Sequence, residues 1–206
     1  ICCSDKKLNS FINQIPKRYH YTKSEDSADP STYKLIFSGI ELAAFMLQFG
    51  EYADKKKIPG FVFDMPREYL ADLIRGYEDT DGYIRDKVHS ISSVNKTLIY
   101  ETAMLIEKCY ERPVSIYKYK RNETAVIEGR TVNQKDSYEL SYKLDSNVQD
   151  KAFFENGCIW YPISSIEYAG KEQTYDIQVE NTHTFLADNA ITHNCTDISI
   201  AGLQKG

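Results

Sequence analysis

Four adjacent residues near the end of the chain carry groups that could break and remake a peptide bond: Thr192-His193-Asn194-Cys195. The side-chain amide of Asn194 can attack its own backbone carbonyl carbon, which forms a five-membered succinimide and breaks the following peptide bond. Because both reacting groups belong to one residue, the attack gains a large effective concentration. The imidazole of His193 can polarise the carbonyl or protonate the departing nitrogen, and the thiol of Cys195 can accept an acyl group. The same short run is also common in exposed loops.

The residues upstream of this run favour the chemical interpretation over the exposed loop. The chain reads Tyr-Asp-Ile-Gln-Val-Glu over 175–180, His-Thr-Phe-Leu-Ala-Asp-Asn over 183–189 and Ile-Thr-His-Asn-Cys over 191–195. This order and spacing closely resemble the C-terminal splicing region of an intein, with its Tyr-Asp strand, its His-x-Phe turn and its terminal His-Asn. The structural alternatives are a strand-end turn residue for Asp176 and a hydrogen-bonded loop histidine for His183.

The resemblance implies a role in protein splicing for each matching residue. Asn194 would be the cyclising residue and His193 its helper. Cys195 would be the first residue of the downstream host protein, or extein, and the nucleophile that takes the acyl group. His183 would assist cyclisation and coordinate the steps, and Asp176 would tune the thiol nucleophiles, because only a thiolate attacks well. Splicing of this kind would need no cofactor.

A second group of charged residues lies in the middle of the chain, where Ile74–Gly82 reads Ile-Arg-Gly-Tyr-Glu-Asp-Thr-Asp-Gly. Asp79 and Asp81 would lie at the C-terminal end of a helix, where the dipole disfavours negative charge. Carboxylates in that place indicate oxygen ligands for a cation such as Mg²⁺; a polar helix end before an Asp-Gly turn is the simpler alternative. Gly76 in mid-helix costs about 1 kcal/mol relative to Ala, so we expect it to serve a close helix–helix approach.

This nonapeptide resembles the LAGLIDADG motif of homing endonucleases. The resemblance implies that Asp81 binds the catalytic metal, Mg²⁺, at the scissile phosphate. It also implies that Lys56, or Lys57 in its place, activates water or stabilises phosphate charge; a solvated basic loop is the alternative for these lysines. Residues 41–49, 56–59, 66–82, 130 and 135–138 extend the likeness to the second-motif region of the endonuclease domain found inside many inteins.

The same resemblance implies a double-stranded DNA target site as a partner, with sheet strands in the major groove. Tyr83, Arg85, Lys87 and His89 alternate along the chain, and we expect them to share one face. Lys118, Lys120 and Arg121 could contact phosphates. Each of these residues taken singly is also typical of an ordinary solvated surface.

Two features depart from the endonuclease pattern. Glu78 stands where the family prefers an apolar residue at the helix interface, so a charge there would weaken the pairing of motif helices. A complete site needs two motifs, each donating an acid, and the chain carries one. We also find no splicing-start nucleophile, because the residues after Cys2 and Cys3 match no splicing start.

Composition excludes several other classes of protein. The formal net charge of −5 argues against a broadly basic nucleic-acid coat, although one local basic face is compatible with it. The five cysteines lack the paired spacing of zinc sites or disulfide frameworks, which favours an intracellular location, cytoplasmic or nuclear. No run of about 18 apolar residues is present, so we expect no membrane partner.

The order of helical and strand patterns along the sequence predicts an α+β protein in three parts. Residues 1–150 alternate helical and strand patterns and resemble a LAGLIDADG endonuclease half. Residues 151–194 read as short strands with turns between them and resemble the C-terminal part of the all-β splicing fold, called Hint. Residues 195–206 would be the start of the downstream extein. Helices are predicted over Ile40–Phe49, Arg67–Tyr77 and Asn95–Tyr110, and C-terminal strands over 158–168, 174–179 and 184–186.

We therefore expect a self-splicing, autocatalytic element with an associated site-specific DNA endonuclease, a hydrolase. A β piece of this size is too small to bury a good core alone, so the upstream intein half and both exteins are expected partners, and the chain by itself is expected to be incomplete for both activities. One alternative is a DNA-binding or endonuclease protein whose splicing end is a relic. Another is an autoprocessing domain that cleaves without ligating. The presence of Cys195, a nucleophile for ligation, disfavours this alternative.

Overall fold

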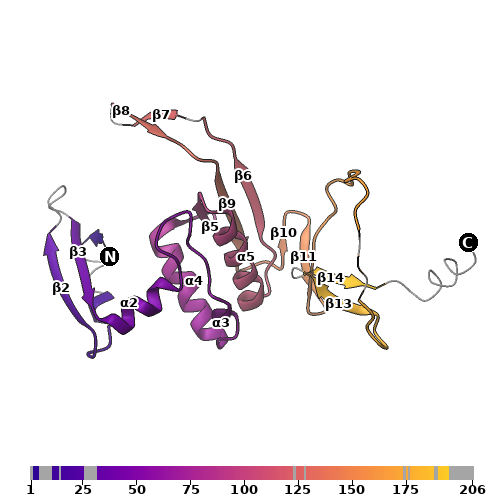
Figure 1. Ribbon diagram of the computed structural model, residues 1–206, viewed down its shortest axis with the longest axis horizontal. Coiled ribbons are helices and arrows are strands. Elements are labelled where there is room, and N and C mark those ends of the chain that lie inside the picture. The colour runs from indigo at the N-terminus through magenta and orange to yellow at the C-terminus, as the bar shows by residue number, and fades with distance from the viewer. Residues whose placement is uncertain are drawn as a thin grey trace, which may run out of the picture.

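The chain forms several small antiparallel sheets around a central unit of helices and sheet (Figure 1). The computed structural model describes residues 2–4, 11–13, 15–25, 32–122, 124–127, 129–173, 175, 177–187 and 190–194. This mixture of helices and strands confirms the predicted α+β class. Among these residues, the helices are all too short or too polar to cross a lipid bilayer.

The N-terminal part is a three-stranded sheet followed by two short helices. The strands pair in the order β1-β3-β2, where β1 is Cys2–Ser4, β2 is His20–Glu25 and β3 is Thr32–Ser38. Helix α2 covers Ile40–Leu47, close to the predicted range, and α3 is the single turn Gly60–Phe63. Beyond α3 the chain enters the central unit.

The central unit is a four-stranded sheet with two helices packed against one of its faces (Figure 1). The strands run in the order β4-β5-β9-β6, with bounds Gly82–Arg85, Val88–Ser93, Ser137–Lys143 and Ser115–Tyr119 respectively. The helices are α4, Arg67–Asp81, and α5, Lys96–Tyr110. A two-stranded ribbon, β7 (Thr124–Ile127) and β8 (Arg130–Asn133), extends from the ends of β6 and β9 (Figure 1).

Alternation along the strands separates the two faces of this sheet. Ile91, Leu140 and Ile116 are cross-strand partners, and they lie in or against the core under the helices. Their neighbours Ser90 and Ser141, also cross-strand partners, lie on the other face. We call that second face the open face of the sheet.

Helix α4 begins after Pro66, as its sequence predicts, and buries Leu70 and Ile74 one turn apart. It ends at Asp81, which confirms the predicted place of Asp79 and Asp81 at a helix C-terminal end. The last turn is stabilised by Gly82, whose backbone N–H donates to the Glu78 carbonyl. A Cβ at Gly82 would lie 2.7 Å from the Glu78 backbone and 3.0 Å from the Ser90 carbonyl oxygen. Only glycine therefore allows the chain to turn directly from α4 into β4.

The C-terminal part contains two small antiparallel sheets. The first has the order β10-β11-β12, with bounds Val148–Gln149, Ala152–Glu155 and Cys158–Trp160. Asn156 and Gly157 connect its last two strands with positive φ angles of 54° and 78°, as Asn-Gly turns typically do. The second is the hairpin of β13, Thr184–Ala187, and β14, Ala190–His193.

The predicted strands over 158–168 and 174–179 are wrong in most of their length. The first stops at Trp160, and neither 161–173 nor the described residues of 174–179 form a strand. Their apolar side chains face solvent: Ile163 is 79% exposed, Ile166 is 88% and Tyr175 is 90%. The strand pattern is present in the sequence, but no described segment pairs with it.

A polar seam joins the central unit to the C-terminal part. The Asp150 carboxylate accepts hydrogen bonds from the Ser115 hydroxyl and, at 2.9 Å, from the Tyr117 hydroxyl. The Tyr161 hydroxyl accepts the Val114 N–H at 2.9 Å and donates to the Glu107 carboxylate. These side chains come from α5, β6 and the segment after β9, so they fix the start of the C-terminal part against the sheet.

Candidate functional site

The β13–β14 hairpin brings together three of the residues predicted to act in splicing. His193 ends β14 and pairs across the hairpin with Thr184, so His183 and Asn194 meet just beyond the last cross-strand pair. The His183 and His193 rings are stacked with their centroids 5.9 Å apart. The Asn194 backbone N–H donates to the His183 carbonyl oxygen at 2.8 Å.

A left-handed backbone at His183 is responsible for this meeting. His183 has φ +54° and Asn181 has φ +68°, a conformation uncommon for residues other than glycine, with Asn and His among the more tolerant. The chain thereby turns tightly into β13 and presents the His183 carbonyl to Asn194. The histidine is thus placed by its backbone as well as by its ring.

Asn194 is 4% exposed, although it lies next to the end of the hairpin. The Nδ1 atom of His193 is 2.6 Å from the Asn194 backbone carbonyl oxygen. With the proton on Nδ1, the imidazole donates to that oxygen and draws electron density from the carbonyl carbon. This is the carbon that an attacking side-chain amide would reach.

The side-chain oxygen of Asn194 is not used by the described part of the fold. Its Oδ1 atom is buried and has no hydrogen-bond partner in the described part of the chain. Buried polar atoms without partners are rare in native proteins and are often found at functional positions. Two further residues predicted for this site, Asp176 and Cys195, lie outside the described residues.

The predicted metal ligand and the predicted lysine lie in the central unit. Asp81 is the last residue of α4, and its side chain is exposed. Burial raises the pKa of Tyr77, one turn earlier, and the Asp81 charge adds to that rise. The Lys56 side chain is also exposed, in the turn before α3. Within the described residues no three His, Cys, Asp or Glu side chains cluster as a metal site.

The prediction that Tyr83, Arg85, Lys87 and His89 share one face is wrong. Asp86 and Lys87 have φ angles of 50° and 66° and form the tight turn between β4 and β5. The turn interrupts the alternation, so Tyr83 and Arg85 lie on the open face, whereas His89 pairs with Ile84 on the opposite face. Lys87 lies in the turn and forms an ion pair with Asp145 at 3.1 Å.

Glu78 does not lie at an outer helix interface, as its position in the motif predicted. Its carboxylate accepts a 2.7 Å hydrogen bond from the Tyr142 hydroxyl and lies 2.9 Å from His89 Nδ1. Burial and the Glu78 carboxylate together raise the pKa of Tyr142. Gly76, by contrast, is exposed, with no described atom within 4 Å of where its Cβ would be. The Glu78 charge therefore points toward the sheet, to Tyr142 and His89, and not toward the outer side of α4.

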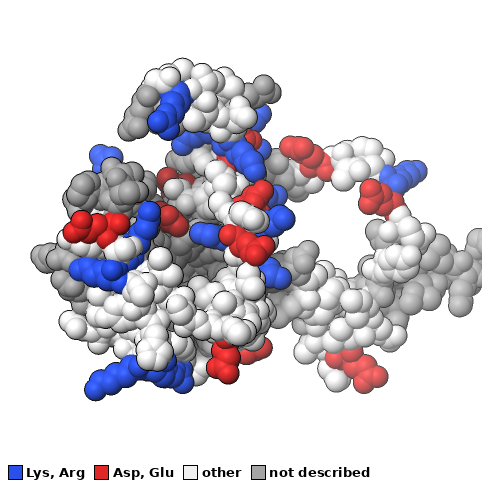
Figure 2. Space-filling model, turned by 60° about the vertical axis from the view of Figure 1, so that its left-hand side comes forward, with Lys and Arg blue, Asp and Glu red and all other residues white. Residues whose placement is uncertain are grey.

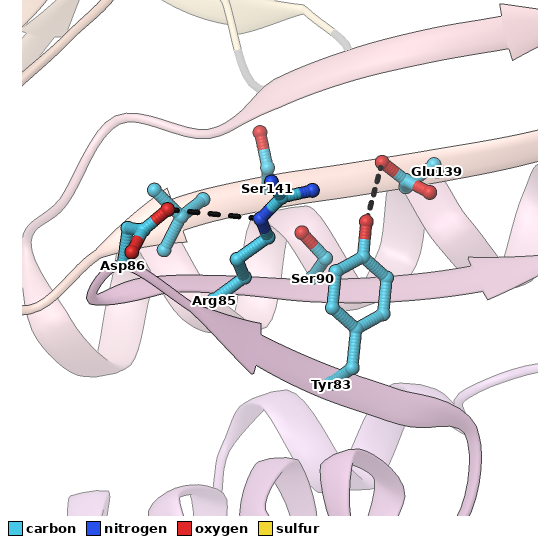
Figure 3. Close-up of a pocket in the computed structure, with 7 residues that line it drawn as sticks. Tyr83, Arg85, Asp86, Ser90, Glu139 and Ser141 are labelled. Carbon is cyan, nitrogen blue, oxygen red and sulfur yellow. Dashed lines mark hydrogen bonds and ion pairs between the residues drawn. The ribbon is translucent and has the colours of Figure 1, made fainter.

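Figure 3 shows a hollow on the open face of the sheet, around the side chains of Tyr83, Arg85, Glu139 and Ser141. The Tyr83 hydroxyl donates to Glu139 at 3.4 Å, and Arg85 lies 3.6 Å from the Asp86 carboxylate. Sequence reasoning missed Glu139. The alternation of Ser, Glu and Ser at 137, 139 and 141 is the signal that could have revealed an outward polar row.

The remaining predicted phosphate contacts lie near the base of the β7–β8 ribbon. Lys118 pairs with Asp136 at 2.9 Å, and the hydrogen bond to that carboxylate raises the pKa of Lys118. The Arg121 backbone N–H donates to the same aspartate, and Lys120 is exposed. Figure 2 shows Lys and Arg side chains interspersed with Asp and Glu across the visible face rather than forming a patch of one sign.

Comparison with known proteins gives relatives of two kinds, and no protein-family profile matches the chain. The chain is 30% identical over 178 residues to a DNA polymerase of Thermococcus sp. (strain GE8), an alignment that covers 74% of this chain and 10% of that protein. It is 28% identical over 147 residues to the DNA-directed RNA polymerase subunit Rpo1C of Methanocaldococcus jannaschii, covering 70% of this chain and 17% of that subunit. A DNA polymerase of Thermococcus hydrothermalis is 28% identical over 178 residues. The chain thus spans a small fraction of the length of these relatives.

Proposed function

We propose that the chain is the C-terminal portion of a protein-splicing element, an intein, that carries a LAGLIDADG-type endonuclease half. One observation carries the proposal: His193 Nδ1 lies 2.6 Å from the carbonyl oxygen of a buried Asn194. In this arrangement an asparagine amide, its own carbonyl and a proton donor are held together. Such an assembly is what cyclisation with peptide-bond cleavage requires.

The chemistry of the step is balanced by groups on this chain. The side-chain nitrogen of Asn194 bonds to its own backbone carbonyl carbon, while His193 stabilises the negative charge that develops on the oxygen. The attacking amide nitrogen gives up one proton as it becomes the imide nitrogen. The carbon–nitrogen bond to residue 195 then breaks, and the departing nitrogen gains one proton, so the proton count of the step is unchanged. The stacked His183 ring is the nearest second imidazole that can take part in this proton transfer. The products are a succinimide at residue 194 and a free amino group on the downstream segment.

The comparisons support an inserted element rather than a polymerase domain. The relatives include DNA polymerases and an RNA polymerase subunit, and the aligned part is 10% to 17% of the DNA polymerase of strain GE8 and of the RNA polymerase subunit. A segment common to two different polymerase types, and small in each, is expected of an element that inserts into unrelated hosts. The whole activity of those hosts is not proposed for this chain.

For the endonuclease, we propose that Asp81 supplies one oxygen ligand for Mg²⁺ and that Lys56 faces the phosphate. The Asp81 carboxylate is exposed and forms no ion pair with any described residue, which fits a metal that takes one or two carboxylates plus substrate phosphates. Bound there, Mg²⁺ would neutralise charge at the scissile phosphate. The second acid would come from another motif helix packed on the outer side of α4. Arg85 on the open face is the proposed contact to double-stranded DNA.

The test of splicing uses the complete element with its flanking host segments. Asn194→Ala should stop release of the downstream segment while the upstream acyl transfer continues, so a branched intermediate with Cys195 should accumulate on a gel. Cys195→Ala should instead allow release of the downstream segment and prevent ligation. Normal ligated product from Asn194→Ala would refute the proposal. Normal cleavage without any ligation in the unaltered element would favour the autoprocessing alternative.

A further inference from the structure

The backbone of the basic turn Lys55-Lys56-Lys57 is held by hydrogen bonds although its three side chains are exposed. The N–H groups of Lys55 and Lys56 donate to the Tyr52 carbonyl at 2.9 and 3.0 Å, and that of Lys57 donates to the Phe49 carbonyl at 2.9 Å. The main chain of the turn is therefore fixed, and the three lysine side chains extend from it.

Asn95 fixes the same turn from the other side. This residue is 6% exposed, and its Nδ2 atom donates to the Lys56 carbonyl at 2.6 Å and to the Ala53 carbonyl at 3.3 Å. Its Oδ1 atom accepts the Leu98 N–H at 3.1 Å, which caps helix α5. One amide therefore both starts a helix and anchors the lysine turn.

Asn95 is also connected, through strand β5, to helix α4. Its backbone N–H donates to the Ser93 hydroxyl at 3.1 Å. Ser93 ends strand β5, against which helix α4 packs, and Tyr77 of that helix packs against the same core. Tyr77 precedes Asp81 by one helical turn, on the same side of α4. Hydrogen bonds thus join the main chain of Lys56 to β5 through Asn95, and β5 packs against the helix that ends in Asp81.

We propose that Asn95 is a positioning residue, which holds the Lys56 main chain in place relative to Asp81; this inference rests on the proposed endonuclease function. The presence of asparagine rather than aspartate at position 95 supports this positioning role. Either residue caps a helix equally well, but only the amide has N–H groups for the carbonyls of Lys56 and Ala53. The cap alone therefore does not require asparagine at this position, whereas anchoring of the turn does.

Asn95→Asp separates the two roles, because it keeps the cap acceptor and removes both donors to the turn. The Lys56 carbonyl would then face a carboxylate and lose its hydrogen bond, which destabilises the turn. In the full chain we expect trypsin to cleave after Lys55, Lys56 or Lys57 about tenfold faster or more, with cleavage after Lys171 as the internal reference. Asn133→Asp makes the same chemical change on an exposed strand and should leave this rate unchanged. Unchanged cleavage in Asn95→Asp would overturn the inference.

The functional readout is Mg²⁺-dependent DNA cleavage by the complete element. We expect Asn95→Asp to lower kcat by roughly 10- to 100-fold, since small misplacement of a catalytic group is costly, with KM for DNA unchanged. Lys56→Ala is the reference variant. If Lys56→Ala cuts DNA normally, the proposed role of Lys56 fails. If Lys56→Ala is inactive but Asn95→Asp keeps a normal kcat, the inference about Asn95 fails instead.

Discussion

The backbone N–H of Asn194 donates a 2.8 Å hydrogen bond to the carbonyl oxygen of His183. This bond connects the residue proposed to cyclise with the histidine proposed to assist it, and it uses main-chain atoms only. The His183 ring is therefore free to stack on His193, at a centroid distance of 5.9 Å. Because the anchor is independent of the side chain, the role of the ring can be tested without removing the anchor.

His183→Asn makes this separation. Asparagine tolerates the left-handed φ of +54° at this position, so the hairpin and the carbonyl contact to Asn194 should persist. The loss of the imidazole should slow release of the segment after Asn194 by about 10²- to 10⁴-fold in the complete element, as followed by mass spectrometry. The midpoint of thermal unfolding should not change. A fall in both rate and thermal midpoint would indicate a structural role for the ring.

His193→Ala should have a similar effect for a different reason. It removes the Nδ1 atom 2.6 Å from the Asn194 carbonyl oxygen, and the oxyanion would lose its nearest donor. We expect cyclisation to slow by about 10²- to 10³-fold, with upstream acyl transfer unaffected. Ile191→Ala, on the same strand and 64% exposed, is the matched control. Equal rates for the two variants would exclude His193 from the step.

The two glycines of the motif Ile74–Gly82, one inside α4 and one just after it, should respond in opposite ways to alanine. At Gly76 no described atom lies within 4 Å of the position that an alanine methyl group would take, so Gly76→Ala should raise the free energy of unfolding by up to about 1 kcal/mol through helix propensity. At Gly82 the new Cβ would lie 2.7 Å from the Glu78 backbone, so Gly82→Ala should lower it. Urea unfolding of the full chain measures both changes.

The Gly76 variant also tests the outer side of α4 in the complete element. If a second motif helix packs closely there, Gly76→Ala should stabilise this chain and still reduce DNA cleavage, because the methyl group would separate the two helices. Unimpaired cleavage would exclude a close helix contact at Gly76.

Asp81→Asn should abolish Mg²⁺-dependent DNA cleavage by the complete element and leave splicing intact. The carboxylate lies at the end of α4, in the central unit, whereas the Asn194 site belongs to the β13–β14 hairpin. Asp72→Asn, on the same helix and paired with Arg75 at 3.5 Å, is the matched control. Cleavage of the target at a normal rate by Asp81→Asn would remove Asp81 from the site.

The sequence predicted the features that depend on local chemistry. The helix start at Asn95 follows from its capping side chain, and that of α4 follows from Pro66. The meeting of His183 with Asn194 could also be expected, because β13 and β14 are a hairpin with short-range pairing. In each case the deciding contacts lie within one helix start or one hairpin.

The failures depend on contacts that local patterns do not contain. The alternation from Arg85 to His89 looked regular, but two left-handed residues, Asp86 and Lys87, reverse the chain between them. Glu78 looked like a charge at an apolar interface because the sequence near it does not show its partners. Those partners, His89 and Tyr142, come from strands β5 and β9. Long-range pairing decided both outcomes.

The two carboxylates of the seam should give opposite pH dependences of stability. Burial raises the pKa of Glu107 above its ordinary 4.5, although the bond from Tyr161 partly offsets the rise. Hydrogen bonds from Ser115 and Tyr117 lower the pKa of Asp150 below its ordinary 3.8. Glu107 therefore contributes stability that is present below about pH 4.5 and is lost as the pH rises through its raised folded-state pKa. Asp150 contributes stability that is present above about pH 3.8 and is lost as the pH falls through its lowered folded-state pKa.

Neutral variants of the two acids isolate these contributions. Glu107→Gln keeps an acceptor for the Tyr161 hydroxyl but does not titrate, so its free energy of unfolding relative to the unaltered chain should increase as the pH rises above about 4.5. Asp150→Asn should be less stable than the unaltered chain at neutral pH, and the difference should shrink as the pH falls below about 3.8. Urea unfolding across this pH range measures both, with Glu172→Gln in the exposed segment as the control. Parallel curves for Glu107→Gln and the unaltered chain would mean that the Glu107 carboxylate is as well solvated in the folded protein as in the unfolded one.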